Sequence, residues 1–518
     1  MKKIFGLLLS IFLLLANVYS QRNYYFNDDG LIEGNGTKEQ PFQSLKILQQ
    51  ISLRPGDSIF FMGDTIAGNI VLNNIHGSKE HSIVFISSAN GATIINGRDN
   101  EALTITGSDY FAITNLTFLG LGRKTGNIAN GINLMNCKNV VLKNLNISGF
   151  QKSGLRLFNC EASEIDSVYS HDNGFAGILI EGDYQKGFSK NIHIVNCRAD
   201  NNPGDPTVLD NHSGNGILVG NSKNVLIEYC SATNNGWDMP RKGNGPVGIW
   251  TYESDSVIIQ NCISYRNKTA LNAADGGGFD LDGGVTNSIV QYCLSYENWG
   301  SGYGIFQYNS AGKWSNNTVR YCVSINDGNV TDKASAMLIW NGLNDDSSFT
   351  DFYAYNNFFY NDSKYAFGFH EQSQHKRFHF YNNIFVAGDT FNIFNGIDSG
   401  SDDVFLGNTW VKKNGGFLQD GFIDLKKWSY SRGYEQYNRR FTGATFHRKL
   451  FLIPGRINIT DPHQLHEDPL LLSFCISSLN DKGIDIKKLL GVDVGKRDFF
   501  GQPIPQGRKF EPGICEMK

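Results

Sequence analysis

One type of short segment recurs through most of this 518-residue chain, at intervals of 23 to 36 residues. Each interval is long enough for one structural unit that stacks on its neighbours, as in solenoid proteins. The intervals are too irregular for leucine-rich or propeller repeats, and they are typical of a β-helix with loops of variable length. The residues that fall on the repeating position are Leu116, Leu145, Val168, Cys197, Cys230, Cys262, Cys293, Cys322, Phe358 and Ile384.

Two columns of identical side chains follow from this alignment. Five of the nine cysteines, from Cys197 to Cys322, occur once per coil, which predicts a stacked apolar column inside the coil rather than disulfides or metal ligands. Five residues further along each repeat is a polar position, where we expect left-handed tight turns and amides that bond each other from coil to coil. That position is occupied by Asn173, Asn202, Asn235, Asn267, Asn298 and Asp327.

A strand follows each of these turns, and its first and third residues are almost all aliphatic or phenylalanine. The strands are predicted at 132–135, 155–158, 178–181, 217–220, 249–252, 279–282, 305–308, 337–340 and 367–370. Because side chains alternate between the two faces of a strand, the second and fourth positions should point out of the coil. The outward face then carries Arg156, Glu181, Trp250, Tyr252, Asp280, Asp282, Phe306, Tyr308, Trp340 and His370.

The segment 276–284 places two acids, Asp280 and Asp282, on this outward face between flanking glycines. Their Cα atoms should lie roughly 6.5 Å apart in a strand. Inverting glycoside hydrolysis needs one carboxylic acid and one carboxylate about 6.5–9.5 Å apart. Like charges at this range also drive the two pKa values apart. The sequence therefore predicts Asp280 and Asp282 as a catalytic pair, without deciding which of them is the acid.

Aromatic rings and three long loops surround the acidic pair. Exposed aromatic rings on one sheet face usually mark an interaction site, and flat rings suit the apolar faces of sugars. The loops 202–216, 236–247 and 268–278 enter successive coils, so we expect them to wall one groove. The predicted substrate-binding residues are Trp250, Tyr252, Phe306, Tyr308, Trp340, Glu181, Arg156, His212, Trp237, Arg241, Glu253, Asp275, Lys268 and His370.

With these features the chain resembles the secreted right-handed parallel β-helix proteins of the pectate-lyase-like superfamily over about residues 24–411. The segment from Leu479 to Glu516 resembles the closing stretch of such bacterial proteins. The resemblance implies an all-β fold, a right-handed single-stranded parallel β-helix built as a three-sheet solenoid. We expect an N-terminal cap and first coils over 21–97, the helix with its carbohydrate groove over 98–411, and a loop-rich C-terminal elaboration over 412–518.

Three functions fit this sequence. The first, which we favour, is an inverting glycoside hydrolase that requires no cofactor or metal. The second is a polysaccharide lyase, in which Asp275, Asp280 and Asp282 would hold Ca²⁺ and Lys268 or Arg241 would act as base. The run of neighbouring aspartates of calcium-dependent pectate lyases is not visible here, nor are the Asp-Asp, Gly-His-Gly and Arg-Ile-Lys motifs of polygalacturonases. The third is a glycan-binding β-helix without catalytic activity, which would keep the aromatics and have no use for the acids.

The amino terminus predicts export. Lys2 and Lys3 precede an apolar block from Ile4 to Ala16 and small residues before Gln21, which is the pattern of a cleaved signal peptide over 1–20. We therefore expect a secreted or periplasmic protein, and no later apolar run is long enough for a membrane span. The formal net charge of −4 becomes −6 when Lys2 and Lys3 are removed, which gives no reason to expect a nucleic-acid partner. The expected partner is a polysaccharide.

Overall fold

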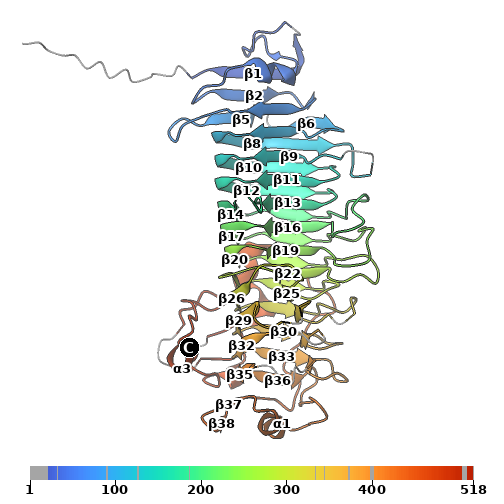
Figure 1. Cartoon of the computed structure of the whole chain (residues 1–518), viewed down its shortest axis with the longest axis vertical. Helices are drawn as coiled ribbons and strands as arrows, with labels where there is room; N and C mark the ends of the chain where they lie inside the picture. Colours follow the sequence, from blue (N-terminus) through green and yellow to red (C-terminus); the bar gives the residue numbers. More distant parts are fainter. Residues whose placement is uncertain are drawn as a thin grey trace, which may run out of the picture.

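The protein is a right-handed parallel β-helix, in which successive coils stack from the N-terminal end to the C-terminal end (Figure 1). The computed structural model describes residues 21–31, 33–88, 91–124, 128–185, 187–332, 334–343, 345–370, 374–396, 402–504 and 510–516. The predicted signal peptide, 1–20, lies outside the described residues. The expected fold class is therefore confirmed, and no helix in the described ranges is long and apolar enough to cross a membrane.

Each coil contributes strands to three faces, and every strand pairs in parallel with its counterparts in the next coils. Face one consists of β1 (Asn23–Leu31), β2 (Ser58–Met62), β5 (Ile83–Ser87), β8 (Asp109–Gly120), β10 (Lys138–Ser148), β12 (Glu161–His171), β14 (Ser189–Val195), β17 (Ser222–Glu228), β20 (Asp255–Gln260), β23 (Ile289–Gln291), β26 (Trp314–Arg320), β29 (Phe349–Tyr355), β32 (Lys376–Tyr381) and β35 (Val404–Leu406). Face two consists of β3 (Thr65–Ala67), β6 (Thr93–Arg98), β15 (Arg198–Asp200), β18 (Ser231–Thr233), β21 (Ile263–Tyr265), β24 (Leu294–Tyr296), β27 (Val323–Ile325), β30 (Phe358–Tyr360), β33 (Ile384–Ala387) and β36 (Thr409–Lys412). The long strands β8, β10 and β12 run around the corner and join these two faces.

Face three is a separate sheet that carries the predicted outward strands. It consists of β4 (Ile70–Asn73), β7 (Leu103–Thr106), β9 (Ile132–Met135), β11 (Ser153–Phe158), β13 (Ala176–Glu181), β16 (Asn215–Gly220), β19 (Val247–Tyr252), β22 (Gly277–Leu281), β25 (Tyr303–Gln307), β28 (Met337–Asn341), β31 (Phe367–Phe369) and β34 (Phe394–Asn395). The first and third positions of the predicted strands do point into the coil: Ile249, Thr251, Phe279 and Leu281 are all buried in the interior.

The cysteine column is present, but its predicted continuation is one residue off. Cys197 to Cys322 are fully buried, unpaired thiols, and the backbone amide of Cys197 donates to Sγ of Cys230 at 3.4 Å. Beyond Cys322 the same position is taken by Asn357, because Val323 is the residue that pairs with Phe358. Our alignment followed apolar character and chose Phe358 and Ile384, which belong to the next position.

The asparagine ladder is confirmed as a chain of side-chain amides. Each Nδ2 donates to the Oδ1 of the next coil, from Asn173 to Asn202 at 3.2 Å and onward to Asp327 at 2.8 Å. The left-handed backbone was assigned to the wrong residue, however. It belongs to the residue just before each ladder amide, as at Asn201 with φ 51° and Asn234 with φ 53°. The ladder residue contributes its side chain to the coil-to-coil hydrogen bonds, and the residue before it adopts the left-handed backbone conformation of the turn.

The two ends of the solenoid are covered. At the N-terminal end lies the 3₁₀ helix η1 (Leu45–Gln50), whose Leu45 and Leu48 are buried. At the other end, α1 (Leu425–Arg432) and the hairpin β37 (Gln436–Tyr437) with β38 (Arg440–Phe441) close the last coil (Figure 1). The remaining helices are η2 (Pro462–Glu467), α2 (Pro469–Leu472), η3 (Ser477–Leu479) and α3 (Ile486–Leu490).

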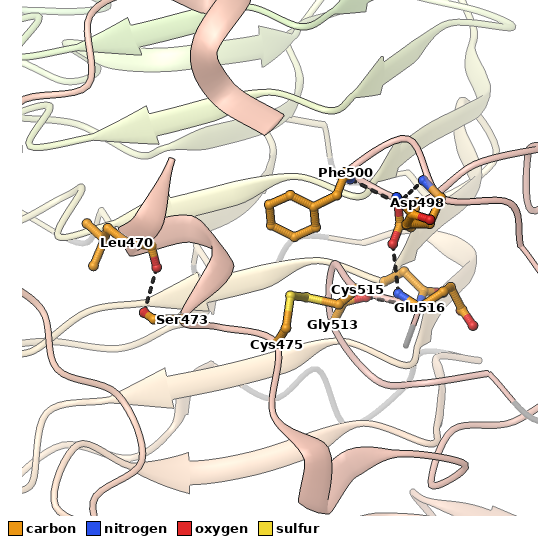
Figure 2. Close-up of a disulfide and its surroundings, with 10 residues drawn as sticks. Leu470, Ser473, Cys475, Asp498, Phe500, Gly513, Cys515 and Glu516 are labelled. Atoms are coloured by element: carbon orange, nitrogen blue, oxygen red, sulfur yellow. Dashed lines mark hydrogen bonds between the residues drawn. A yellow bond between two sulfur atoms is a disulfide. The ribbon is translucent and has the colours of Figure 1, made fainter. Parts of the chain in front are cut away.

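The C-terminal part folds back along the outside of face two. It buries Phe451, Leu471 and Phe474 in one apolar cluster with Leu294 and Phe358 of the coils. A disulfide joins Cys475 to Cys515 and fixes the last described residues to this layer (Figure 2). The pattern that argued against disulfides holds for the column cysteines, whereas these two lie outside the repeat. No described residue after 411 lines the pocket described below.

Candidate active site

The floor of the candidate site is the outward side of face three, at strands β19, β22, β25 and β28. In this register Asp280 lies between Trp250 of β19 and Gly304 of β25, and Phe306 lies beside Trp340 of β28. The sequence alignment paired Phe279 with Ile305, but Phe279 pairs with Tyr303. The error is two residues, so it preserves the side on which each side chain lies and changes only which residues are neighbours.

Loops and floor together enclose a pocket with a volume of about 720 Å³. Both predicted catalytic residues, Asp280 and Asp282, line it. So do eight of the predicted substrate-binding residues: Trp250, Tyr252, Phe306, Tyr308, Trp340, His212, Asp275 and His370. Pockets of this size accept ligands of the size of a short oligosaccharide.

The outward face is more enclosed than the sequence suggested. We expected the acids and rings to be displayed to solvent, but Asp280 is only 3% exposed, Trp250 4% and Phe306 9%. Two further outward residues, Leu179 and Leu218, are also buried. The reason is that the long loops fold over this sheet, so that the acids lie at the bottom of a pocket rather than on an open surface.

Asp280 is the most unusual group in the pocket. Its Oδ1 is buried and has no hydrogen-bond partner within the described part of the chain. Burial raises its pKa well above the ordinary value, and the neighbouring carboxylates of Asp282 and Asp275 raise it further. Gly304 leaves the space beside it, because a Cβ there would stand 2.9 Å from Oδ1 of Asp280. Asp280 is therefore held in its protonated form.

Asp282 directly follows β22 and continues its ladder, since its backbone amide donates to the carbonyl of Thr251 at 2.9 Å. Its Oδ1 accepts a hydrogen bond from the amide of Gly283 at 2.7 Å. Burial raises its pKa to about 7, the Gly283 bond opposes the rise, and the charges of Asp275 and Glu253 add to it. The two acids thus differ: the pKa of Asp282 lies at about 7, whereas burial and two neighbouring carboxylates raise the pKa of Asp280 well above its ordinary value with no opposing hydrogen bond.

Asp275 reaches the same pocket from the loop 268–278. The amide of Gly245 donates to its Oδ2 at 2.8 Å, and burial raises its pKa to about 6. Its charge acts on both Asp280 and Asp282. The charge of Asp275 therefore raises the pKa values of both Asp280 and Asp282.

His212 supports the floor. It is 9% exposed, and burial, together with the nearby positive charge of Arg241, lowers its pKa to about 4, so it is neutral. Its ring meets the edge of Trp250 at 4.9 Å between centroids. Asn215 holds both rings: its Nδ2 donates to Nδ1 of His212 at 3.0 Å, and its Oδ1 accepts from Nε1 of Trp250 at 3.1 Å. Sequence reasoning missed Asn215, because an asparagine at the start of a strand looks like one more turn residue.

Six predicted substrate-binding residues do not line the pocket. Glu253 lies behind Tyr308 and accepts its hydroxyl at 3.1 Å. Glu181 accepts the hydroxyl of Tyr252 at 3.4 Å and pairs with Arg156 at 3.4 Å. The others bond elsewhere, Trp237 to Asn201 and Lys268 to Asn234 at the turns, and Arg241 to Asn244. Lining residues that the sequence analysis did not single out are Tyr184, Asn211, Asn244, Gly304, Thr331, Asp332 and Leu338.

A metal site was considered for the three aspartates. In the described ranges, no group of three or more His, Cys, Asp or Glu side chains is arranged to hold a metal ion.

The fold and the pocket define a parallel β-helix protein with an acidic pocket on one sheet face. The family model described as "Pel9A-like, right handed beta helix region" matches residues 24–332. The chain therefore belongs to this Pel9A-like β-helix family, which confirms the resemblance to pectate-lyase-like β-helices. No curated protein matches the chain.

Several solved structures are similar. A GH136 lacto-N-biosidase from Eubacterium ramulus is 16% identical, with 75% of this chain and 67% of that chain covered and a TM-score of 0.49. The pectate lyase Pel9A is 14% identical, with 85% and 94% covered and a TM-score of 0.42. A mannuronic acid specific polysaccharide family 6 lyase from human gut microbiota is 12% identical, with 80% and 90% covered and a TM-score of 0.47. These likenesses bear on the fold and not on the reaction.

Proposed function

We propose that this protein is an exported polysaccharide-degrading enzyme, a glycoside hydrolase that uses Asp280 as general acid and Asp282 as general base. The observation that carries the proposal is the contrast between two neighbouring carboxyl groups in one pocket. Asp280 is buried, has no described partner on Oδ1 and is held protonated, whereas Asp282 ionises near neutral pH. Pairs of acids with pKa values driven apart are how one site supplies an acid and a base at the same pH.

In this mechanism Asp280 donates its proton to the glycosidic oxygen as the bond to the anomeric carbon breaks. The Asp282 carboxylate takes a proton from a water molecule, whose oxygen bonds to the anomeric carbon from the opposite face. Asp280 ends ionised and Asp282 ends protonated, and exchange with solvent restores both. Outward neighbours on one strand have Cα atoms about 6.5–7 Å apart. Carboxyl groups at a similar separation would suit the roughly 6.5–9.5 Å of inverting enzymes rather than the roughly 5–5.5 Å of retaining ones.

The rest of the pocket suits a neutral sugar. The rings of Phe306, Tyr308 and Trp340 offer apolar faces to pyranose rings. Four acids, Asp275, Asp280, Asp282 and Asp332, line the pocket, and none of its described lining residues is Lys or Arg. The lining acids would repel a uronic acid unit, and Arg241, which bonds the lining residue Asn244, does not itself line the pocket. The charge pattern of the lining therefore favours an uncharged glycan.

A cation-dependent lyase is the second candidate, and membership in a family named for Pel9A is the observation that favours it. Asp275, Asp280 and Asp282 are oxygen donors of the kind that Ca²⁺ prefers. The described side chains do not form a group arranged to hold a metal, however, and neither expected base lines the pocket: Lys268 bonds Asn234, and Arg241 bonds the lining residue Asn244. We derive no step through a bound cation.

The test is an activity screen of the mature protein, beginning at Gln21, on a panel of plant and algal polysaccharides. New reducing ends, with the product anomer inverted by NMR and no effect of a chelator, would support the hydrolase. An ultraviolet-absorbing unsaturated product that a chelator abolishes would replace it by the lyase. Binding to a glycan without any turnover would identify a non-catalytic β-helix. Detection of the protein in the culture medium or periplasm, with Gln21 as its first residue, would test the proposed export.

A further inference from the structure

We propose that the pocket is closed at its N-terminal end and binds the end of a glycan chain, so that the enzyme releases one or two sugar units per cleavage instead of cutting within the chain. This inference rests on the proposed hydrolase function. Its basis is a wall, formed by the side chains of β13, β16 and β19, that fills the outward face of the sheet next to the acidic pair.

The first half of the wall is apolar. Trp250 is the neighbour of Asp280 on the preceding coil, and Leu218 and Leu179 follow it on the next two coils. The three form one buried cluster and are at most 4% exposed. An extended sugar chain that continued over these coils would have to displace side chains that are already packed against each other. The floor therefore ends at Trp250.

The second half of the wall is Tyr252, which lies across the neighbouring coil. Its partner in the register there is Gly220, and a Cβ on that glycine would stand 2.2 Å from Cζ of the Tyr252 ring. The ring reaches over Gly220 and its hydroxyl donates to Oε1 of Glu181 at 3.4 Å. Because Gly220 has no side chain, the Tyr252 ring can pack directly over its backbone and block the outward face at this coil.

The loop 202–216, which lies beside the wall, is held by bonds to two other parts of the chain. Asp205 accepts from Nζ of Lys152 at 2.6 Å and from Nε2 of Gln151 at 2.9 Å. Arg123 donates to the carbonyl of Gly204 at 2.8 Å and is ion-paired with Asp238 of the next loop. Buried and charge-assisted bonds of this kind hold a loop in one position. The wall is therefore a fixed part of the site.

Towards the C-terminal end the pocket continues. Phe306, Leu338, Trp340 and His370 all line the pocket on the coils that follow the acidic pair. On the other side the wall begins at Trp250, on the coil next to Asp280 and about 4.8 Å away, so the space between the acidic pair and the wall is short. The polymer must then enter from the C-terminal side and present its end to the wall.

The experiment is a time course on the panel polysaccharide that yields new reducing ends. We expect mono- or disaccharides to be the only small products from the first time point, with viscosity falling slowly relative to reducing ends. Early appearance of longer oligosaccharides, with a rapid loss of viscosity, would overturn chain-end binding while leaving the hydrolase proposal intact. Absence of any new reducing ends from the whole panel would overturn both.

Opening the wall gives a second, independent readout. Tyr252→Ala removes the ring over Gly220, and we expect products of three or more units to appear. Tyr252→Phe keeps the ring and loses only the hydroxyl with its bonds to Glu181 and Tyr184, so it should retain the short products. Tyr430→Ala, a matched loss of an exposed tyrosine in α1, is the control. Equal product sizes for Tyr252→Ala and Tyr430→Ala, with both variants folded by circular dichroism, would show that the wall does not set product length.

Discussion

The asparagine ladder and the acidic pair are two sets of buried polar groups that the same coils treat in opposite ways. In the ladder, the side chain of Asn267 is fully bonded: its Nδ2 is within bonding distance of Asn298, Ser264 and the carbonyl of Ala232, and its Oδ1 accepts from Asn235. On the other side of the same coils, Asp280 is almost as buried and its Oδ1 has no described partner. An unpaired buried polar group costs about 1–3 kcal/mol, so it persists where it serves something other than stability.

The difference teaches how a repetitive fold carries a site. A ladder can extend through many coils because each copy satisfies the next one. A functional pair must break that repetition: Asp280 and Asp282 have Trp250 and Tyr252 on one side and Gly304 and Phe306 on the other. The neighbours differ from coil to coil, so each carboxyl group has its own surroundings and its own pKa.

The strongest way to break the comparison is to replace the acids by their amides. Asp280→Asn and Asp282→Asn should each lower kcat by roughly 10²–10⁴-fold, because a general acid or base is lost. The melting temperature should change little, since no described bond to the Asp280 carboxylate is removed. Asp99→Asn, which changes an exposed acid, is the matched control. Variants that keep more than a tenth of the activity would remove the pair from the mechanism.

A substitution in the ladder should have the opposite effect, lowering stability and leaving activity unchanged. Asn267→Leu deletes the side-chain bonds of Asn267, removes the acceptor of the buried backbone N–H of Asn235 and takes one of two acceptors from Nδ2 of Asn235. The loss should destabilise the protein by roughly 2–4 kcal/mol. Activity per folded molecule should remain, because Asn267 is buried inside the coil and does not line the pocket. Urea unfolding followed by circular dichroism measures the first effect, and a turnover assay the second. The exposed Asn100→Leu should be near neutral, and an equal loss in both variants would contradict the ladder's role.

Most of the architecture could be predicted from the sequence because the solenoid repeats its own chemistry. The ladder position follows each column cysteine by five residues, although the intervals between coils vary. An error in the alignment of one coil is therefore corrected by the others. The alignment failed where the chemistry changed without a change of fold: Asn357 replaces a cysteine in the column, and an alignment based on apolar character shifted to Phe358. The Cys475–Cys515 disulfide could not be predicted, because both residues lie outside the repeat.

The site was predictable in part for the same reason. Alternation along a strand assigned Asp280, Asp282, Phe306 and Trp340 to one face, and a shift of two residues in register did no harm to that assignment. Exposure was a different matter, because it depends on how long loops fold over the sheet. No local pattern marks Leu218 as covered, or Tyr252 as lying over Gly220.

The end of the ladder offers a way to sharpen the comparison by pH. Asp327 is the one acid at the ladder positions described above, and burial raises its pKa to about 7 despite bonds from Ser324 and Asn298. A raised acid pKa means that the folded state holds a proton that the unfolded state releases from about pH 4 upward. Stability from this group is therefore present below about pH 4 and is lost as the pH rises through 7.

Asp327→Asn should remove that dependence. An amide can accept from Asn298 and donate to Oγ of Ser324, as the amide of Asn267 donates to Ser264 at 3.0 Å. We expect the variant to be more stable by about 1–3 kcal/mol at pH 8 and equal to the parent near pH 4. Unfolding midpoints in urea at the two pH values measure this. A gain of the same size at both would mean that the proton of Asp327 is not the cause.

The smallest effect should come from Asp275, the acid whose charge links the loop 268–278 to the pair. Asp275→Asn keeps an acceptor for the amide of Gly245 and removes a negative charge that raises the pKa of Asp282. Ionisation of Asp282 then becomes easier, and because the proposed base must be ionised, the acid limb of the kcat/KM profile should move to lower pH with little change at the optimum. Asp99→Asn should leave the profile in place. An acid limb that stays fixed, or moves to higher pH, would show that the charge of Asp275 does not raise the pKa of Asp282. The pKa of Asp282 would then depend on its burial and hydrogen bonds, as for the buried polar groups of the ladder.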